Sequence, residues 1–203
     1  MKKSSIPSKE YCSFSLGCGG LTRTDDLWVM SPTSYQLLLI RSKRLKHHAG
    51  EICFPGGKLE SGESTIACAL RETQEELHIP PEAIEVIGEL DFLYLRSEAL
   101  LCPVLAQISA AGMEAIRCEA EEVSGTLLIP VKTLTAHPPK RYRYRMPAAV
   151  GSDFPYKKAG ITPEYPWQAG VLEVPVYEDL PYPLWGLTAR ITYWLLHEAG
   201  NRP

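Results

Sequence analysis

The chain has 203 residues, of which 45% are hydrophobic and 22% are charged, and its formal net charge is −3. This length and composition predict a single well-buried domain over residues 1–203. They exclude a disordered acidic tail and a strongly basic nucleic-acid-binding surface. No apolar run is long enough to span a bilayer, and Met1 to Pro7 lacks the apolar core of a secretory signal.

The cysteines point to an intracellular environment. Several lie in apolar stretches, where cysteine behaves as a small buried hydrophobe. They form no CxxC pair, which argues against a zinc site. We expect all six to be reduced in a cytoplasmic protein: Cys12, Cys18, Cys53, Cys68, Cys102 and Cys118.

The first third of the chain predicts one clear strand. Residues 1–30 contain a Gly19-Gly20 turn, but the sequence assigns them no role. Tyr35 to Ile40 is a short apolar run, typical of a buried strand. A basic polar segment, Arg41 to His48, follows it. Gly50 to Gly57 then predicts a strand and a turn.

The clearest helix is predicted from Ser64 to Leu77. Apolar residues and Thr73 recur at helical spacing on one face. Glu63 and Ser64 place acidic and polar groups at the positive end of the helix dipole. The helix should stop at Ile79-Pro80-Pro81, because proline cannot continue it.

The rest of the chain mixes further strands with one more helix. Apolar runs predict strands over residues 84–90, 100–108 and 127–129, and Arg141 to Arg145 alternates as a strand with one aromatic face. Residues 147–183, rich in Pro, Gly and Tyr, predict an ordered loop. A last helix is expected from Leu187 to Glu198, ending at Gly200. The fold class is therefore α/β or α+β.

The predicted helix 64–77 gathers negative charge along one edge. Glu72 and Glu76 are one turn apart and share a face, and Glu75 flanks them. Like charges this close repel each other unless a cation lies among them. Carboxylate oxygens select a hard cation such as Mg²⁺ or Mn²⁺ over zinc. The alternative interpretation is an acidic helix face that simply points into water.

The residues around this edge favour the metal site. The Gly56-Gly57 turn lets a backbone carbonyl approach a cation, because glycine has no Cβ in the way. Arg71 is placed to pair with a nearby carboxylate, or with Glu63, and so to hold the preceding loop. Such a cation would neutralise the oxygens of a diphosphate, orient its bridging bond and activate a water molecule.

The segment Gly57 to Ile79 resembles the Nudix box. The match consists of Gly57, then Glu63 after five residues, Arg71-Glu72 after seven, and Glu75-Glu76 after two. Two positions depart from the box. Thr73 replaces an aliphatic residue on the buried face, where it should be tolerated. His78 replaces a glycine at the helix end, which should cost about 1 kcal/mol or force another turn.

This resemblance implies a Nudix α/β/α sandwich with a mixed sheet. It also implies that Glu72, Glu75 and Glu76 supply the metal ligands and the catalytic base, with the Gly56 carbonyl as a backbone ligand. Arg71 belongs to the same catalytic group. The sequence leaves open which glutamate is the base.

A second motif is similar to the signature of coenzyme A diphosphatases. It runs from Leu37 to Arg41-Ser42 and ends at Phe54-Pro55-Gly56-Gly57, with Leu39 in place of threonine and Lys46 in place of arginine. Two further segments resemble the same family more weakly. They are Glu122-Val123 with Ile129-Pro130, and Trp185 to Arg190. This likeness implies metal-dependent hydrolysis of coenzyme A or acyl-CoA to 4′-phosphopantetheine and adenosine 3′,5′-bisphosphate.

The sequence also suggests roles for residues outside the box, in substrate binding or in core packing. Arg41 can grip phosphate with two hydrogen bonds, Lys46 adds positive charge, and Glu122 could complete the site, with Glu119 and Glu121 as rivals. His47 and His48 are expected in an exposed loop. Tyr142 and Tyr144 could stack on an adenine ring, but core packing is the favoured expectation for them, and Trp185 is expected to anchor the last helix in the core.

Three functions remain open from the sequence. The leading one acts on a small CoA-like nucleotide, without nucleic acid or membrane, and the oligomeric state could be a homodimer. The first alternative is a Nudix hydrolase for ADP-ribose or a dinucleoside polyphosphate. The second is a non-catalytic Nudix binding module, although such domains typically lack box glutamates that this chain retains.

Overall fold

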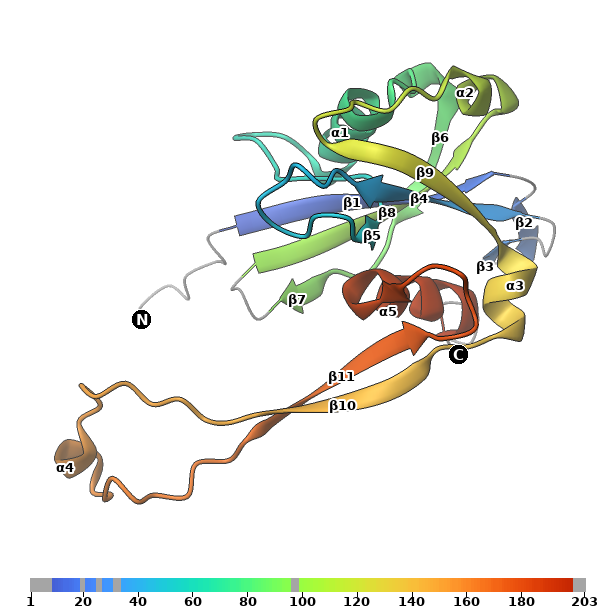
Figure 1. Cartoon of the computed structure of the whole chain (residues 1–203). Coiled ribbons are helices and arrows are strands. Elements are labelled where there is room, and N and C mark those ends of the chain that lie inside the picture. Colours follow the sequence, from blue (N-terminus) through green and yellow to red (C-terminus); the bar gives the residue numbers. More distant parts are fainter. Residues whose placement is uncertain (1–8, 19–20, 25–26, 31–33, 96–98, 199–203) are drawn as a thin grey trace.

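The structure is a computed structural model that describes residues 9–18, 21–24, 27–30, 34–95 and 99–198, and it describes side chains from Ser34 onward. Within these ranges the chain forms a large central sheet, two smaller sheets and several helices (Figure 1). The predicted turn at Gly19-Gly20 and the predicted helix end at Gly200 lie outside the described residues.

The central sheet contains seven strands in the order β5-β4-β1-β8-β6, with β7 also paired to β8 and β9 to β4. β1 runs parallel to β8, whereas the other described pairs are antiparallel, so the sheet is mixed as predicted. The strands are β1 (Lys9–Cys18), β4 (Tyr35–Arg41), β5 (Ile52–Cys53), β6 (Ile84–Glu89), β7 (Leu93–Leu95), β8 (Ala99–Ile108) and β9 (Val123–Pro130).

Helices cover both faces of this sheet. Helix α1 (Thr65–Leu77) packs on one face, where Leu37 and Leu39 of β4 join its buried residues in one hydrophobic cluster. Helix α5 (Gly186–Tyr193) packs on the other face, where Leu38 lies in a second cluster. The alternation of Leu37, Leu38 and Leu39 follows from the two-residue period of a strand. A mixed sheet between helices confirms the predicted α+β sandwich.

The ends of α1 are set by two side chains. Ser64 caps the start, because its Oγ accepts a hydrogen bond from the backbone N–H of Ala67 at 3.2 Å. His78 ends the helix in the left-handed conformation, with φ 57° and ψ 24°, and its N–H donates to the carbonyl of Gln74. His78 therefore takes the backbone conformation of the glycine that it replaces.

The smaller elements complete the chain. A two-stranded sheet joins β2 (Leu21–Thr24) to β3 (Leu27–Met30), and a three-stranded sheet has the order β10-β11-β12. The latter contains β10 (Lys140–Met146), β11 (Gly170–Tyr177) and β12 (Leu184–Trp185). The short helical segments are η1 (Pro81–Ala83), α2 (Ala110–Ala115), α3 (Val131–Ala136), α4 (Tyr156–Ala159) and the π-helical turn η2 (Trp194–Glu198).

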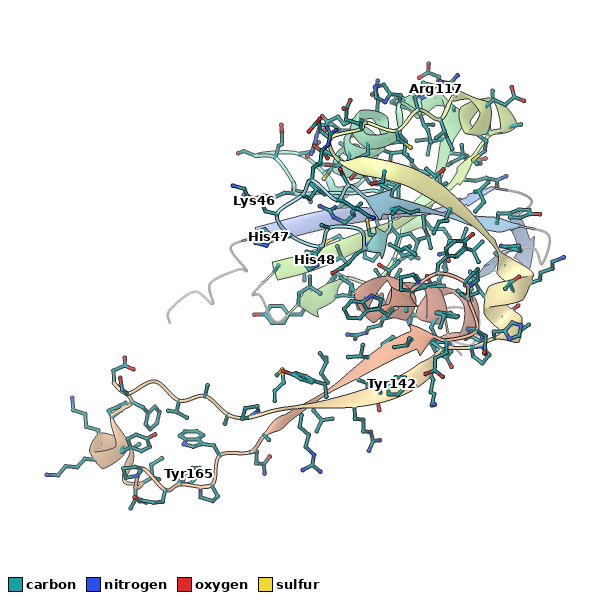
Figure 2. All side chains as sticks on the ribbon, in the orientation of Figure 1. Lys46, His47, His48, Arg117, Tyr142 and Tyr165 are labelled. Carbon is teal, nitrogen blue, oxygen red and sulfur yellow. The ribbon has the colours of Figure 1, made fainter. Side chains whose placement is uncertain are left out.

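Several sequence predictions are wrong at this level. The loop predicted for residues 147–183 contains β11, because β10 provides a pairing partner that local composition does not reveal. Tyr142 and Tyr144 are exposed, since β10 lies in a projecting ribbon (Figure 2). Trp185 is also exposed, and Leu184 beside it is the buried residue of β12. The last helix changes to a π-helical turn after Tyr193.

The cysteines follow the expectation in part. Cys53 and Cys118 are free thiols, and both are partly buried. Cys68 is fully buried but disulfide-bonded, so the expectation of a reduced thiol is wrong for this residue. None of the described helices combines the length and the apolar character that crossing a bilayer would require.

Candidate active site

The three glutamates of α1 differ sharply in their exposure to solvent. Glu76 is 3% exposed, the Glu72 side chain is 15% exposed, and the Glu75 side chain is 58% exposed. The shared face predicted for Glu72 and Glu76 therefore points inward, toward the loop that precedes the helix. Glu75 lies at the outer edge of the same group.

Glu76 is a buried carboxylate with repelling neighbours. Its Oε2 accepts a hydrogen bond from the backbone N–H of Gly56 at 3.1 Å. Burial raises its pKa to about 8, and the negative charges of Glu72 and Glu122 act in the same direction. The Gly56 hydrogen bond and the charge of Arg41 oppose this rise. A bound cation would stabilise the ionised carboxylate that burial disfavours.

Glu72 lies directly against the glycine turn. A Cβ placed on Gly57 would come within 2.3 Å of the Glu72 carboxyl group, so only glycine leaves room for this approach. Burial raises the pKa of Glu72, and the charges of Glu75 and Glu122 add to the rise, against the hydrogen bond and charge of Arg71. The carboxylates of Glu72, Glu76 and Glu122 therefore influence one another.

Arg71 ties the loop before α1 to the acidic edge. Its guanidinium donates to both oxygens of Glu63 at 2.9 and 3.1 Å, and to the carbonyl of Lys58 at 3.2 Å. It also donates to Glu72 at 2.8 Å and to Glu75 at 3.0 Å. The hydrogen bond from Arg71 lowers the pKa of Glu63. The pairing with Glu63 that the sequence suggested is present.

Glu122 reaches the same group from a distant loop. The backbone N–H of Glu119 donates to the carbonyl of Glu76 at 2.9 Å, and that of Ser42 donates to the carbonyl of Glu122 at 2.7 Å. Glu121 is held apart in an ion pair with Arg44. Of the three glutamates that the sequence offered, Glu122 is the one whose charge acts on Glu72 and Glu76.

These residues fit a hard divalent cation. The described part of the chain holds no group of three His, Cys, Asp or Glu side chains already arranged around one point. Arg71 holds Glu72 and Glu75 in ion pairs at 2.8 and 3.0 Å. The donors themselves, a buried carboxylate beside two others, are the all-oxygen set that Mg²⁺ and Mn²⁺ prefer.

The predicted phosphate-binding residues lie on the neighbouring segment. The charge of Arg41 acts on the carboxyl group of Glu76 and on the thiol of Cys53, whose pKa burial raises to about 11. The Arg41 Nε is buried and has no hydrogen-bond partner among the described residues. The Arg41 side chain thus lies in the buried region around Glu76 and Cys53.

Lys46 lies farther out. It is exposed on the loop after β4, beside His47 and His48 (Figure 2). Both histidines are exposed, as predicted, and His48 pairs with Glu51 at 3.1 Å. The structure thus brings Arg41, Glu122 and the helix glutamates together, whereas Lys46 lies on the exposed loop outside this group.

A cavity that the sequence did not reveal lies on the other face of the sheet. It has a volume of about 510 Å³, and its lining joins β7, β8 and β11 to α5. The lining residues include Asp91, Phe92, Arg141, Arg190, Tyr193 and Trp194. They come from segments far apart in the chain, so local patterns could not have indicated them. None of the predicted site residues lines this cavity.

Two solved structures resemble this chain at low sequence identity. A C. elegans Ap4A hydrolase binary complex is 17% identical, with a TM-score of 0.46, over 62% of this chain and 83% of that chain. A MutT/nudix family protein from Enterococcus faecalis is 15% identical, with a TM-score of 0.48, and the match covers 95% of this chain and 62% of that chain. Both TM-scores lie below 0.5, so family membership rests on the sequence comparisons.

Relatives with higher identity carry more specific names. Nudix hydrolase 3 of Caenorhabditis elegans is 34% identical over 58% of this chain and 52% of its own length. The mitochondrial coenzyme A diphosphatase NUDT8 of Mus musculus is 33% identical over 77% of this chain and 66% of its own length. The protein of the same name from Homo sapiens is 31% identical over 79% of this chain and 61% of its own length. The chain thus spans about half to two thirds of the length of these relatives.

The family itself follows from a match over more than half of the chain. Residues 22–146 match the family model described as the NUDIX domain. This range contains the glycine turn, the acidic helix and the Glu122 loop whose geometry is described above. The chain belongs to the NUDIX domain family.

Proposed function

We propose that this protein is a divalent-metal-dependent hydrolase of the diphosphate in coenzyme A or acyl-CoA. The products are 4′-phosphopantetheine, or its acyl derivative, and adenosine 3′,5′-bisphosphate. The observation that carries the proposal is the buried Glu76 carboxylate, flanked by Glu72 and Glu122 and held by the Gly56 N–H at 3.1 Å. A buried group of carboxylates is unfavourable while all of them are ionised, and a bound cation would offset this cost.

The residues divide the chemistry among them. Glu72 and Glu76 would hold Mg²⁺ or Mn²⁺, with Glu122, Glu75 and the Gly56 carbonyl as further candidate ligands. The bound cation neutralises the phosphate oxygens and increases the acidity of a water molecule. Arg71 keeps the loop from Lys58 to Glu63 against the helix and so positions the glycine turn.

Four residues are proposed to transfer protons or to bind phosphate. Glu72 and Glu75 are the candidate general bases, and both lie within 3.0 Å of the Arg71 guanidinium. Arg41 has a buried Nε without a described partner, which can donate to a phosphate oxygen beside Glu76. Lys46, exposed at the rim, adds positive charge for the outer part of the substrate.

The choice of coenzyme A rests on two likenesses. The segment from Leu37 to Gly57 is similar to the signature of coenzyme A diphosphatases. Two relatives that are 31% and 33% identical bear the name coenzyme A diphosphatase. Arg41 and Gly56, which belong to that segment, both lie beside Glu76 in the structure.

A substrate panel tests the proposal. The protein is incubated with Mg²⁺ and with coenzyme A, acetyl-CoA, ADP-ribose or a dinucleoside polyphosphate, and the products are identified by mass spectrometry. We expect adenosine 3′,5′-bisphosphate from the first two substrates and little turnover of the others. Cleavage of ADP-ribose with no attack on coenzyme A would replace this substrate by the first alternative.

A matched pair of variants separates catalysis from simple binding. Glu76→Gln should lower turnover by roughly 10²-fold or more, because it removes a charged metal ligand, whereas Glu82→Gln, on exposed η1, should leave turnover unchanged. Isothermal titration with Mg²⁺ should show the same contrast. If the Glu76 variant hydrolysed substrate and bound metal as well as the wild type does, the result would favour a non-catalytic module.

The cellular location belongs to the same proposal. We expect a cytoplasmic protein, although the two relatives named as diphosphatases are mitochondrial. Cell fractionation followed by detection with an antibody would decide between the two.

A further inference from the structure

The segment Lys140–Tyr177, called the arm below, projects from the body as a two-stranded ribbon (Figure 1). β10 and β11 pair along their length, from Lys140 opposite Val176 to Met146 opposite Gly170. β12 pairs only with Val176 and Tyr177 at the base of the ribbon. The far half of the arm, with α4, stands clear of the rest of the described chain (Figure 1).

The tip of the arm has its own side-chain packing. The ring of Phe154 contacts those of Tyr156 and Trp167 edge-on, with centroids 4.9 and 5.3 Å apart. Tyr165, labelled in Figure 2, contacts Trp167 in the same way at 5.1 Å. The tip is therefore a structured element that can present a defined surface.

The arm exposes apolar side chains along its length. Tyr144 is 57% exposed and Val171 is 55% exposed, and these two residues come from opposite strands of the ribbon. Tyr142, Tyr165 and Trp167 are exposed as well. Apolar surface gathered on a projecting element is typical of a contact with another molecule.

The charge of the arm is opposite to that of the remaining chain. The arm carries six basic and three acidic residues, a net charge of +3, in a chain whose net charge is −3. The rest of the chain therefore carries −6. β10 contains four basic residues and no acidic one: Lys140, Arg141, Arg143 and Arg145. Glu173 of β11 pairs with Arg141 at 3.8 Å and with Arg143 at 3.5 Å, so one carboxylate faces these two arginines.

The complementary surface is one edge of the central sheet. β6 and β7 both pair with β8, and no described strand pairs with their other side. Residues 81–95, called the acidic edge below, contain no Lys or Arg but four acidic residues: Glu82, Glu85, Glu89 and Asp91. Phe92 and Tyr94 on this edge are 67% and 63% exposed.

We propose that the arm of one copy of this chain lies against the acidic edge of a second copy, so that two copies exchange arms in a symmetric dimer. Charge and apolar content match on both surfaces, and the exchange closes, because each copy offers one arm and one edge. This interface does not depend on which substrate the protein cleaves.

Two other arrangements are less favourable. Pairing the β10 edges of two copies would bring arginines opposite arginines, and like charges across a strand pair are destabilising. Among the described residues, contact of the arm with its own acidic edge is limited to one cavity, which Asp91 lines together with Arg141, Leu172 and Glu173 of the arm. Neither Arg143 nor Arg145 lines this cavity. Arg143 and Arg145 lie beyond Arg141 along β10, toward the tip.

The expected size of the interface includes the tip. A stable contact removes roughly 800 Å² from each partner. A ribbon of seven and eight residues extends only about 25 Å. The aromatic tip is therefore part of the proposed interface, along with the ribbon.

Sedimentation velocity and light scattering test the proposal on the full chain. We expect a dimer at low salt that dissociates as NaCl is raised, because salt screens exposed charges. Arg143→Glu with Arg145→Glu should give a monomer, and so should Glu82→Lys with Glu85→Lys. All four substitutions in one chain should restore the dimer, because the charges are then exchanged between the surfaces.

The controls keep the test decisive. Lys132→Glu and Arg117→Glu, both exposed and outside the residues of the arm and the acidic edge, should leave the dimer intact. Thermal melting establishes that each variant is folded, and Tyr144→Ser with Val171→Ser probes the apolar part should a charge variant fail to fold. A monomer under all conditions would overturn the proposal. So would a dimer that survives both charge reversals, or four substitutions that do not restore it.

Discussion

At the scale of single residues, the metal site depends on a glycine as much as on its carboxylates. Glu72 occupies the space that a side chain at Gly57 would need, and Glu76 receives the Gly56 N–H. The spacing of the box predicted which glutamates matter. It could not predict that Arg71 would bind Glu63, Glu72 and Glu75 together, because that depends on how the loop folds back onto the helix.

Gly57→Ala should lower turnover by about 10- to 100-fold with little loss of stability. Gly57 does not have a positive φ, so alanine fits the backbone. The added Cβ would lie 2.3 Å from the Glu72 carboxyl group and would therefore displace this carboxylate. Steady-state kinetics and thermal melting measure the two effects. Gly88→Ala is the control, since no described atom lies within 4 Å of its added Cβ. Equal kinetics for both variants would contradict this account.

Thr73→Val should raise the free energy of unfolding by about 1 kcal/mol. Thr73 is fully buried, and its hydroxyl has no hydrogen-bond partner among the described residues, so valine removes an unsatisfied polar group at nearly constant volume. Thr188→Val is the matched control. It should lose about 1 kcal/mol, because the Thr188 hydroxyl donates to the Ile52 carbonyl at 3.0 Å. Urea unfolding measures both, and a loss at both positions would contradict the prediction.

At the scale of elements, hydrophobic periodicity predicted α1, β4, β6 and β8 within a few residues of their observed bounds. Each of these segments buries residues at a regular spacing. β9 begins at Val123, four residues earlier than predicted, because its first half is held by pairing to β4 and not by an apolar run. β11 was missed for a similar reason, since its pairing with β10 spans a long connection.

His78→Gly should stabilise the end of α1 by about 1 kcal/mol, because glycine adopts a φ near 57° without the strain of a side chain. The lost contact between His78 Nδ1 and the Arg117 carbonyl, 3.1 Å and exposed, should reduce the gain only slightly. Chemical denaturation measures the change. His78→Ala keeps the strain and loses the ring, so it should show no gain. A gain of the same size in both variants would point to the ring instead.

At the scale of the whole molecule, the titration of Glu76 links stability to pH. Its pKa of about 8 in the folded protein lies above the ordinary value of 4.5, so between these pH values the native state keeps a proton that the unfolded chain has lost. The stability from this group is complete below pH 4.5 and is lost as pH rises toward 8. The slope should approach, but not exceed, about 1.4 kcal/mol per pH unit.

Bound metal should oppose this loss of folding stability at higher pH. Mg²⁺ binds the ionised carboxylates, so its stabilising effect should grow from pH 6 to pH 8, within the range of the raised Glu76 pKa. Thermal melting with EDTA or with Mg²⁺ across this range measures both effects. Glu76→Gln should flatten the EDTA profile. Parallel profiles for the wild type and this variant would show that Glu76 titrates normally.

The sequence assigned no role to residues 1–30, yet β1 lies between β4 and β8 and joins the two halves of the central sheet. The family match, at residues 22–146, omits both β1 and α5. A fragment trimmed to that match would leave a gap in the middle of the sheet and bare the hydrophobic cluster beneath α5. Anyone expressing this protein should therefore retain the amino-terminal strand and the last helix, since the trimmed version is expected to aggregate.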